Sequence, residues 1–355
     1  MTGTPVPSGG VGAKDRHVEV CLTQDVESTT TTGLEDYRLD GALPDVAYAD
    51  LDTRLTLFGR GLRMPLLISS MTGGGERSGE VNLRLAAAAQ RHGLGMAVGS
   101  QKLMLRDPDA AASFRVRSVA PDILLFADLG LVHLNYGFGR AECLRAVEAI
   151  EADALALYVN PLHEAFQPAG DLDFTGLLDR LADLLADFPY PVVVKEVGAG
   201  LPESLLARLS EPPFAEVLGG VETAGLGGTH WGRVEALVAG RPVGGPEEEL
   251  GTRTADSLVA AVRHLPAGMP VIATGGIRTG VQAAKALALG ATTVGMALPL
   301  LRSAAISADH LDATIARFRR ELLLAMWHAG CADLGALRGK ARRVPARGIP
   351  AGVTP

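Results

Sequence analysis

The chain has 355 residues, 47% of them apolar and 21% charged, a composition that can bury a large core and excludes a disordered polypeptide. Its 40 acidic and 33 basic residues give a formal charge of -7 without a basic stripe interleaved with aromatics, so we expect no nucleic-acid partner. Cys21, Cys143 and Cys331 form no CxxC pair, and neither a leader nor a long apolar run is visible. We therefore expect a cytoplasmic protein without disulfides, zinc or membrane contact.

Short apolar runs bounded by Gly, Pro or Asp alternate along the chain with segments of helical periodicity. Eight runs are predicted to be strands, at 65–70, 94–99, 123–129, 154–160, 191–197, 216–223, 270–275 and 292–297. Helices are predicted between them at 81–92, 141–152, 174–186, 202–209, 254–264 and 280–289. Eight such alternations close a barrel more naturally than an open sheet, so the predicted fold class is α/β, a (β/α)8 TIM barrel.

The segments outside this pattern set the predicted domain boundaries. Residues 1–12 are expected to be a flexible tail, residues 13–338 a single domain, and residues 339–355 a flexible basic tail. Within the domain, the apolar stretch 55–65 could pair across the bottom of the barrel. Residues 241–252, RPVGGPEEELGT, are predicted to be a mobile loop after the sixth strand, on the catalytic face.

Glycine-rich turns follow the last three predicted strands. Gly275 and Gly276 follow the seventh strand, and Arg278 adds a positive charge there. The eighth strand ends at 295–298, and 225–229 form a third turn with a hydroxyl donor. Barrel enzymes often bind phosphate at this position, so the turns predict a phosphate site, although the same glycines could simply make tight βα turns.

Charged residues also occur where the barrel mouth is expected. Lys195 lies in the apolar strand PVVVKEV, and burying its charge alone would be costly. It could contact the polar edge of a flavin or pair with a carboxylate such as Glu196 or Glu222, and Asp128 has the same two interpretations. Small polar residues end the first two strands, at 69–74 and 99–102. These would suit the flat edge of a heterocycle.

Seven stretches of sequence, in order, resemble the type 2 isopentenyl diphosphate isomerases. They are TTGLEDYRLDGALPDV, SSMTGGGE, VGSQKLML, NPLHEAFQPAGDLDF, VVVKEVGAG, AGLGGTHW and ATGGIRTGVQAAKALALGA. The similarity spans roughly residues 14–330, and the NPLHEAFQPAGDLDF stretch is characteristic of this family rather than of flavin barrels at large.

The resemblance implies an FMN-dependent enzyme that converts isopentenyl diphosphate to dimethylallyl diphosphate. Reduced FMN would shuttle a proton, Mg²⁺ would bridge protein and diphosphate, NADPH would reduce the flavin, and the chain would form a homo-oligomer, a tetramer or octamer. The implied flavin contacts are Ser70, Met71, Thr72, Ser100, Asp128, Lys195, Thr229, Gly275, Gly276, Arg278, Ala297 and Leu298. The implied substrate contacts are Lys14, His17, Ser100, Lys102 and His163, the metal ligand is Glu164, and the catalytic cluster is Asn160, His163, Glu164 and Gln167.

The sequence departs from the family pattern on the substrate side. Ala13 and Lys102 each stand where the family has an arginine, and these changes remove bidentate phosphate contacts. His163 replaces a glutamine and adds either an acid–base group or an equivalent hydrogen bond. Asp128 replaces an asparagine and would disfavour an anionic reduced flavin unless Lys195 compensates.

Two further departures, Gly75 for a threonine and Leu250 for a tryptophan, are expected to enlarge the cavity. They leave open a second function, isomerisation or cyclisation of a larger prenyl substrate. A third, a net redox FMN oxidoreductase, is less favoured because no cysteine lies in a predicted βα loop.

Overall fold

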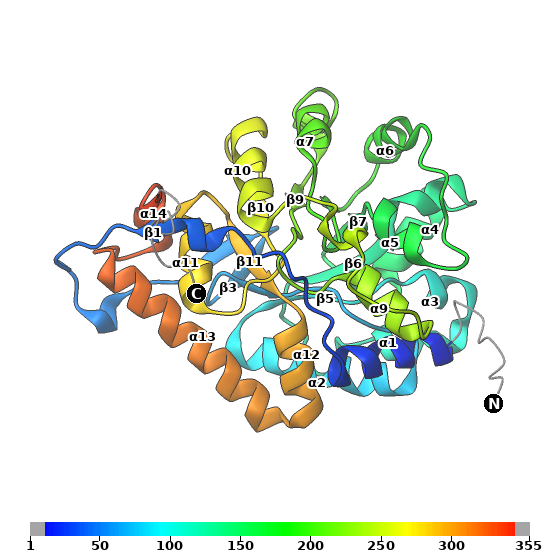
Figure 1. The fold of residues 1–355 in the computed structure, drawn as a ribbon, viewed down its shortest axis with the longest axis horizontal. Helices are drawn as coiled ribbons and strands as arrows, with labels where there is room; N and C mark the ends of the chain where they lie inside the picture. The colour runs from blue at the N-terminus through cyan, green and yellow to red at the C-terminus, as the bar shows by residue number, and fades with distance from the viewer. Residues whose placement is uncertain (1–10, 345–355) are drawn as a thin grey trace, which may run out of the picture.

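Eight parallel strands close a barrel that is surrounded by helices in the computed structural model of the chain, which describes residues 11–344 (Figure 1). Around the barrel the strands follow the order β10-β11-β4-β5-β6-β7-β8-β9. Their bounds are β4 Leu66–Ile68, β5 Gly95–Ala97, β6 Leu125–Gly130, β7 Ala154–Tyr158, β8 Val192–Lys195, β9 Gly220–Glu222, β10 Val271–Ala273 and β11 Thr293–Met296. The predicted (β/α)8 barrel is confirmed, and each predicted strand overlaps an observed one.

One helix precedes all the strands, and the others occupy the segments between the strands and one long C-terminal stretch. The α-helices are α1 Val11–Thr23, α2 Glu76–His92, α3 Lys102–Arg106, α4 Arg140–Glu148, α5 Pro161–Phe166, α6 Leu177–Leu185, α7 Glu203–Leu209, α8 Phe214–Val217, α9 Trp231–Val238, α10 Thr254–His264, α11 Gly280–Ala288, α12 Leu298–Ile306, α13 Ala308–His328 and α14 Leu334–Leu337. The 3-10 turns are η1 Leu34–Asp36, η2 Tyr48–Asp50, η3 Pro108–Phe114, η4 Leu131–Asn135 and η5 Pro246–Glu249. In Figure 1, α1 lies beside α9 and α12.

The sixth strand begins later than predicted. The expected start at residue 216 is wrong, because Phe214–Val217 form the short helix α8, with Phe214 buried against the core. The strand begins only at Gly220, where the chain approaches β10 so closely that an added Cβ would lie 2.6 Å from the Pro270 carbonyl oxygen. Only a glycine fits at position 220, because any side chain there would clash with the neighbouring strand.

The acidic segment 241–252 lies after the sixth strand, as predicted, but helix α9 stands between them. The segment also contains the turn η5. Glu248 in this turn is buried and accepts hydrogen bonds from Arg233 at 3.1 Å and from the Gly244 amide at 2.7 Å. A carboxylate bound in this way anchors the segment, which the composition alone did not indicate.

Both predicted tails are too long. Helix α1 already begins at Val11, and Ala341–Arg343 form strand β12, which pairs antiparallel with β1 Tyr37–Leu39. The pairing satisfies backbone groups that a free tail would leave to solvent. Residues 1–10 and 345–355 lie outside the described range, and the single-domain prediction for 13–338 stays a prediction.

The barrel interior changes from apolar at the bottom to polar at the top. Side chains along a strand alternate between its two faces, so residues two apart point the same way. Phe126 and Val193 belong to an interior apolar cluster, and Asp128 and Lys195 follow two residues later on the same strands. The polar layer therefore lies at the carboxyl ends of the strands, the face on which barrel enzymes carry their sites.

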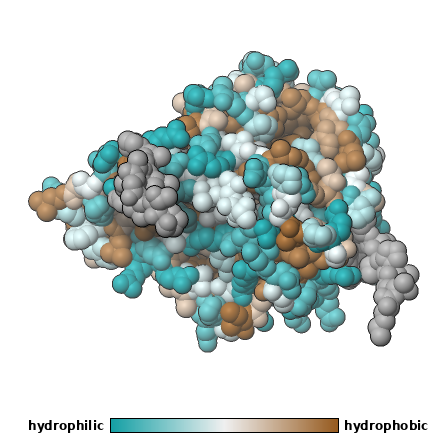
Figure 2. Space-filling model, in the orientation of Figure 1, coloured by the Kyte–Doolittle hydropathy of each residue, from teal (hydrophilic) through white to brown (hydrophobic). Residues whose placement is uncertain are grey.

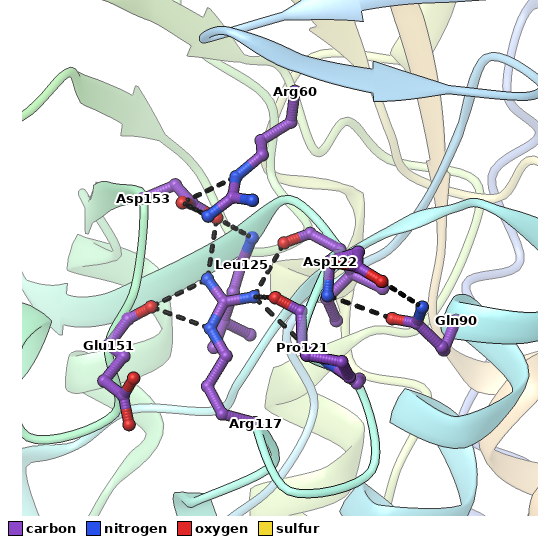
Figure 3. A network of polar contacts seen from close by, with 10 residues as sticks. Arg60, Gln90, Arg117, Pro121, Asp122, Leu125, Glu151 and Asp153 are labelled. Carbon is purple, nitrogen blue, oxygen red and sulfur yellow. Dashed lines mark hydrogen bonds and ion pairs between the residues drawn. The ribbon is translucent and has the colours of Figure 1, made fainter.

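A hairpin closes the bottom of the barrel. Strands β2 Leu55–Leu57 and β3 Arg60–Leu62 pair antiparallel and add Leu57 and Leu62 to the interior cluster, as predicted for 55–65. Arg60 donates to Asp153 Oδ1, and Arg117 donates to the other oxygen at 2.8 Å (Figure 3). The guanidinium of Arg117 also donates to the carbonyls of Glu151 and Ile123, so the network ties three parts of the chain together.

The outer surface mixes residue types. Figure 2 shows hydrophobic residues lying beside hydrophilic ones over much of the visible face. Within residues 11–344, no helix combines the length and the apolar character that crossing a bilayer requires.

Candidate functional site

A cavity of about 780 Å³ opens at the carboxyl ends of the strands. Its walls come from the βα loops and from α1, α3, α5 and α9. All the predicted flavin contacts line it, namely Ser70, Met71, Thr72, Ser100, Asp128, Lys195, Thr229, Gly275, Gly276, Arg278, Ala297 and Leu298. The predicted substrate contacts Lys14, His17, Lys102 and His163 line it too, with Glu164 and Gln167, whereas Asn160 lies buried behind Glu164. Segments far apart in sequence are thus brought to one cavity.

One wall is formed mainly by backbone. Gly275 and Gly276 adopt φ values of 98° and 68°, and a Cβ on Gly276 would lie 2.0 Å from the Gly227 carbonyl oxygen, so the tight turn requires glycine. The amide N–H groups of both glycines donate to no acceptor within residues 11–344. The first turn of α12, at Leu298, lies on the same wall without a side-chain cap. The wall therefore presents free N–H donors and a helix N-terminus, which suit an anion.

Arg278 adds the charge predicted for this wall, but it is engaged. Its guanidinium donates to Glu27 Oε1, with 2.9 Å from Nε, and Glu27 lies just after α1. Glu27 is 42% exposed at its side chain, so water can replace this contact when an anion takes the guanidinium.

The centre of the cavity floor is a buried charge cluster. Lys195 Nζ lies 3.9 Å from Asp128 Oδ2, and Ser70 donates to the same oxygen at 2.6 Å. Burial raises the pKa of Asp128 to about 6, against the lowering effects of Lys195 and the Ser70 hydrogen bond. Burial lowers the pKa of Lys195, but Glu222 and Asp128 more than reverse this, so its pKa is raised overall. Lys195 is thus a cation held between carboxylates.

Glu196 is excluded as the direct partner of Lys195. Its carboxylate Oε2 accepts from the amides of the next four residues, Val197, Gly198, Ala199 and Gly200, at 2.5–3.2 Å. A carboxylate so occupied fixes the loop after β8. Of the two alternatives in the sequence, the register supports Glu222, which pairs with Lys195 across β8 and β9.

The opposite wall is formed by side chains, and the residue that contacts both of its histidines, Glu235, was not predicted from the sequence. Glu235 on α9 is buried, and its Oε1 lies 3.1 Å from His17 Nε2 and 2.8 Å from His163 Nε2. Burial would raise the pKa of Glu235, but the hydrogen bonds from His163 and His17 lower it to about 2. The ring of Trp231 lies 5.0 Å from that of His163, centroid to centroid. Glu235 and Trp231 therefore fix both predicted histidines.

The predicted catalytic cluster is assembled on α5. Glu164 is buried, and it accepts from Asn160 Nδ2 at 2.8 Å and from the Asp171 amide at 2.8 Å. Asn160 Oδ1 is buried and has no hydrogen-bond partner among the described residues. Gln167 Nε2 lies 3.0 Å from His163 Nε2. The four residues predicted to act together thus touch one another, through the first two turns of one helix.

Lys102 has a partner that the sequence did not reveal. Its Nζ lies 2.5 Å from Asp171 Oδ2, and Asp171 follows α5. Tyr158, at the end of β7, donates to Ser100 at 3.0 Å. The partners Asp171 and Tyr158 lie in or beside the NPLHEAFQPAGDLDF stretch, which was the available signal for them. For Glu235 the only signal in the sequence was its position four residues after Trp231, the last residue of the AGLGGTHW motif.

The expectation of a larger cavity is wrong for both substituted positions. Gly75 does not line the cavity, and a Cβ there would lie 2.2 Å from Asp15 Oδ1, so the glycine allows α1 to pack closely. Leu250 is 51% exposed on the segment after α9 and does not line the cavity either. Neither residue therefore contributes to the wall of the cavity.

Curated relatives resemble the chain over nearly its whole length. An isopentenyl-diphosphate delta-isomerase of Synechococcus sp. is 46% identical over 331 residues, covering 92% of this chain and 94% of the relative. The proteins of the same name from Mycobacterium marinum and Deinococcus radiodurans are 45% and 42% identical, covering 92% and 95% of this chain and 94% and 98% of each relative. The chain belongs to the isopentenyl-diphosphate delta-isomerase family. The resemblance expected from the seven motifs is confirmed.

Two other similarities of this isomerase-family chain concern its fold. Residues 244–343, which include the glycine wall, match the family model of FMN-dependent dehydrogenases. Solved structures of mandelate oxidase share the architecture at 21% identity, one with an FMN adduct (TM-score 0.61, covering 93% of this chain and 96% of the other) and one with benzoyl-formic acid (TM-score 0.59, 94% and 91%). These similarities support the barrel fold and do not indicate which reaction the site carries out.

Proposed function

We propose that the chain is an FMN-dependent enzyme that interconverts isopentenyl diphosphate and dimethylallyl diphosphate with Mg²⁺. The observation that carries this proposal is the two-walled cavity. One wall offers backbone N–H donors for a phosphate, and the other offers Lys14, His17 and Lys102 beside the carboxylate of Glu164. A cofactor phosphate and a substrate diphosphate would each find donors on a separate wall, with the polar floor at Lys195 between them.

The glycine wall fits the phosphate of FMN. The free amides of Gly275 and Gly276 and the start of α12 are donors without protein partners in the described chain. Arg278 would add a charge-assisted contact. Lys195, raised in pKa by Glu222 and Asp128, would hold a cation at the polar edge of the ring system. The remaining predicted contacts, from Ser70 to Thr72, line the same cavity.

The α5 cluster fits Mg²⁺ only in part, which agrees with the chemistry of that ion. Within residues 11–344, no group of three His, Cys, Asp or Glu side chains is arranged to hold a metal. Glu164 offers carboxylate oxygens, and Asn160 Oδ1 is an adjacent buried oxygen that accepts from no donor in residues 11–344. Mg²⁺ is often bound through one or two protein oxygens, with substrate phosphates and water completing its shell. Glu164 would hold the ion in this way.

Reduced FMN supplies the proton donor and acceptor for the alkene when it is bound. The side chains of this protein hold the substrate for that step. Lys14, His17 and Lys102 bind the diphosphate, and Glu235 fixes the His17 ring through Nε2. Trp231 packs against His163 and excludes water from that side. His163 Nε2, bonded to Glu235 Oε1, keeps a polar hydrogen at the cavity wall without exposing it to bulk water.

The remaining parts of the proposal follow from the family resemblance. NADPH would reduce the flavin before turnover, the chain would assemble as a homo-oligomer, and it would act in the cytoplasm. Of the alternatives, the larger prenyl substrate has lost the support of Gly75 and Leu250, which do not line the cavity. A redox enzyme that uses a cysteine nucleophile finds no candidate, because Cys21, Cys143 and Cys331 are all buried outside the cavity.

Turnover with defined cofactors tests the proposal. Purified protein is loaded with FMN, reduced anaerobically with NADPH, and incubated with isopentenyl diphosphate and Mg²⁺. We expect dimethylallyl diphosphate to form in many turnovers for each NADPH consumed, and not to form with oxidised flavin or with excess chelator. Failure to bind FMN, or consumption of one NADPH for each product, would contradict the proposal.

A further inference from the structure

Half of the lysines and arginines that line the cavity have no ion-pair partner within residues 11–344. Three of its cations have carboxylate partners: Lys102 with Asp171, Lys195 with Asp128, and Arg278 with Glu27. The three others, Lys14, Arg16 and Arg106, form no ion pair within the described part of the chain. The chain contains more acidic than basic residues, 40 against 33, so a shortage of carboxylates does not explain this. Unpaired cations in a concave site indicate an anionic ligand.

Arg106 is the best oriented of the three. It lies on α3 four residues after Lys102, so both side chains emerge on one face of the helix. Its guanidinium carbon lies 5.8 Å from the ring centre of Phe138, which restricts the guanidinium while leaving its N–H edges free. No comparable aromatic contact holds Arg16 within the described residues.

A second observation shows that these cations converge. His133 is buried on the cavity wall, and its pKa is lowered to about 3, first by burial and then by the positive charges of Lys102, Arg106 and Lys14. Asp171 acts in the opposite direction, with its Oδ2 3.8 Å from His133 Nε2. Cations from α1 and α3 therefore act on the same point, where like charges repel unless an anion lies between them.

We propose that Arg106 is a specificity-determining residue, which binds the terminal phosphate of the substrate diphosphate while Lys102 and Lys14 bind the phosphate nearer the prenyl group. This inference rests on the diphosphate substrate of the proposed function and deepens it. The Lys102–Arg106 pair presents two cations one helical turn apart, which matches two linked phosphates better than a single phosphate. The guanidinium of Arg106 is suited to two parallel hydrogen bonds, whereas Lys102 acts as a point charge. Arg106 thereby selects diphosphates over monophosphates.

The test is calorimetric binding of inorganic pyrophosphate and of orthophosphate to the FMN-loaded protein at fixed ionic strength. Arg106→Gln is expected to weaken pyrophosphate binding about tenfold or more, while orthophosphate binding changes by less than about threefold. Arg106→Lys should fall between wild type and Arg106→Gln for pyrophosphate, because charge remains and the bidentate geometry is lost. Arg106 is exposed at the cavity mouth, so these variants are expected to fold.

Two control variants separate direct contact with pyrophosphate from general electrostatic attraction. Arg16→Gln removes an equally unpaired cation that also lines the cavity, and Arg115→Gln removes an exposed arginine at the end of η3, away from it. Both are expected to change pyrophosphate binding by less than about threefold at moderate salt. Equal losses in Arg16→Gln and Arg106→Gln, or equal losses for both anions, would overturn the assignment.

The outcomes also separate this inference from the proposed function. If Arg106→Gln binds pyrophosphate as wild type does, only the role of Arg106 is overturned. If wild type binds no pyrophosphate, both proposals fall. If the pyrophosphate effect is found but isopentenyl diphosphate is not turned over, the diphosphate grip stands and the reaction must be sought with another prenyl diphosphate.

Discussion

The two ends of the barrel use charge in opposite ways. At the bottom, Asp153 accepts from Arg60 and Arg117 and also from the Leu125 amide, so both of its oxygens are bonded (Figure 3). At the top, several buried polar atoms have no partner within the described chain, including Ser69 Oγ, His133 Nδ1 and Asn160 Oδ1. The bottom network is complete without a ligand, and the top one is not.

This difference follows from what each end must do. A closed network stabilises the hairpin seam, because every buried charge has its partner. An open set of donors and acceptors costs stability in the free protein but leaves groups that a ligand can bond. Residues at the bottom should therefore affect unfolding and not binding, and residues at the top should do the reverse.

The largest expected effect is at the top, for Glu164→Gln. Removing the carboxylate should lower Mg²⁺-dependent turnover on the order of 1000-fold, because the neutral amide is a weak ligand for a hard cation. The urea midpoint should stay close to that of wild type. Glu203→Gln, on the exposed start of α7, is the matched control and should leave turnover unchanged. A Glu164→Gln enzyme with normal turnover would remove this residue from the site.

At the bottom, Asp153→Asn should lower the free energy of unfolding by about 3 kcal/mol, because two guanidinium groups lose their carboxylate. This figure allows for Arg60, whose side chain is 39% exposed and partly screened by solvent. FMN titration of the folded variant should give the wild-type affinity. Asp312→Asn breaks an exposed pair with Arg91 and should cost well under about 1 kcal/mol. A loss of FMN affinity in Asp153→Asn would contradict the assignment of stability to the bottom of the barrel and of binding to the top.

The smallest expected effect is the pH dependence of stability that comes from Asp128 on the cavity floor. The pKa of Asp128 is raised from 3.8 to about 6, so the folded ligand-free protein binds a proton there that the unfolded chain releases. Stability from this proton is fully present below pH 4 and is lost as the pH rises through 6. Relative to Asp128→Asn, wild type should lose on the order of 2 kcal/mol between pH 4 and 7.

Urea unfolding of both proteins across this pH range measures the difference. The groups that face Asp128, namely Lys195, Glu222, Ser70 and Lys14, are present in both proteins, so the comparison isolates the effect of the Asp128 carboxyl together with its coupling to them. If wild type instead gains stability relative to Asp128→Asn as the pH rises, Lys195 overrides burial and keeps Asp128 ionised.

Much of the barrel could be predicted because its signals are local. Eight apolar runs with helical segments between them determine the strand count, and Gly275 and Gly276 mark their turn by spacing alone. The motifs placed eighteen of the nineteen different site residues predicted by resemblance around one cavity, with Asn160 directly behind Glu164. The sixth strand was predicted to begin at residue 216 because short apolar runs suit a strand as well as one turn of helix, and residues 216 and 217 belong to α8.

Amino-acid order determined by itself the barrel, its polar rim and the identity of most site residues, since strand alternation and turn chemistry act over a few residues. Only the tertiary structure decided which charges meet. Glu235 bridges His17 and His163, and Lys102 meets Asp171, because barrel closure and the docking of α1 bring distant segments within hydrogen-bond distance. The same closure leaves Gly75 and Leu250 outside the cavity lining, since the position of a loop residue relative to the cavity depends on packing that no local pattern encodes.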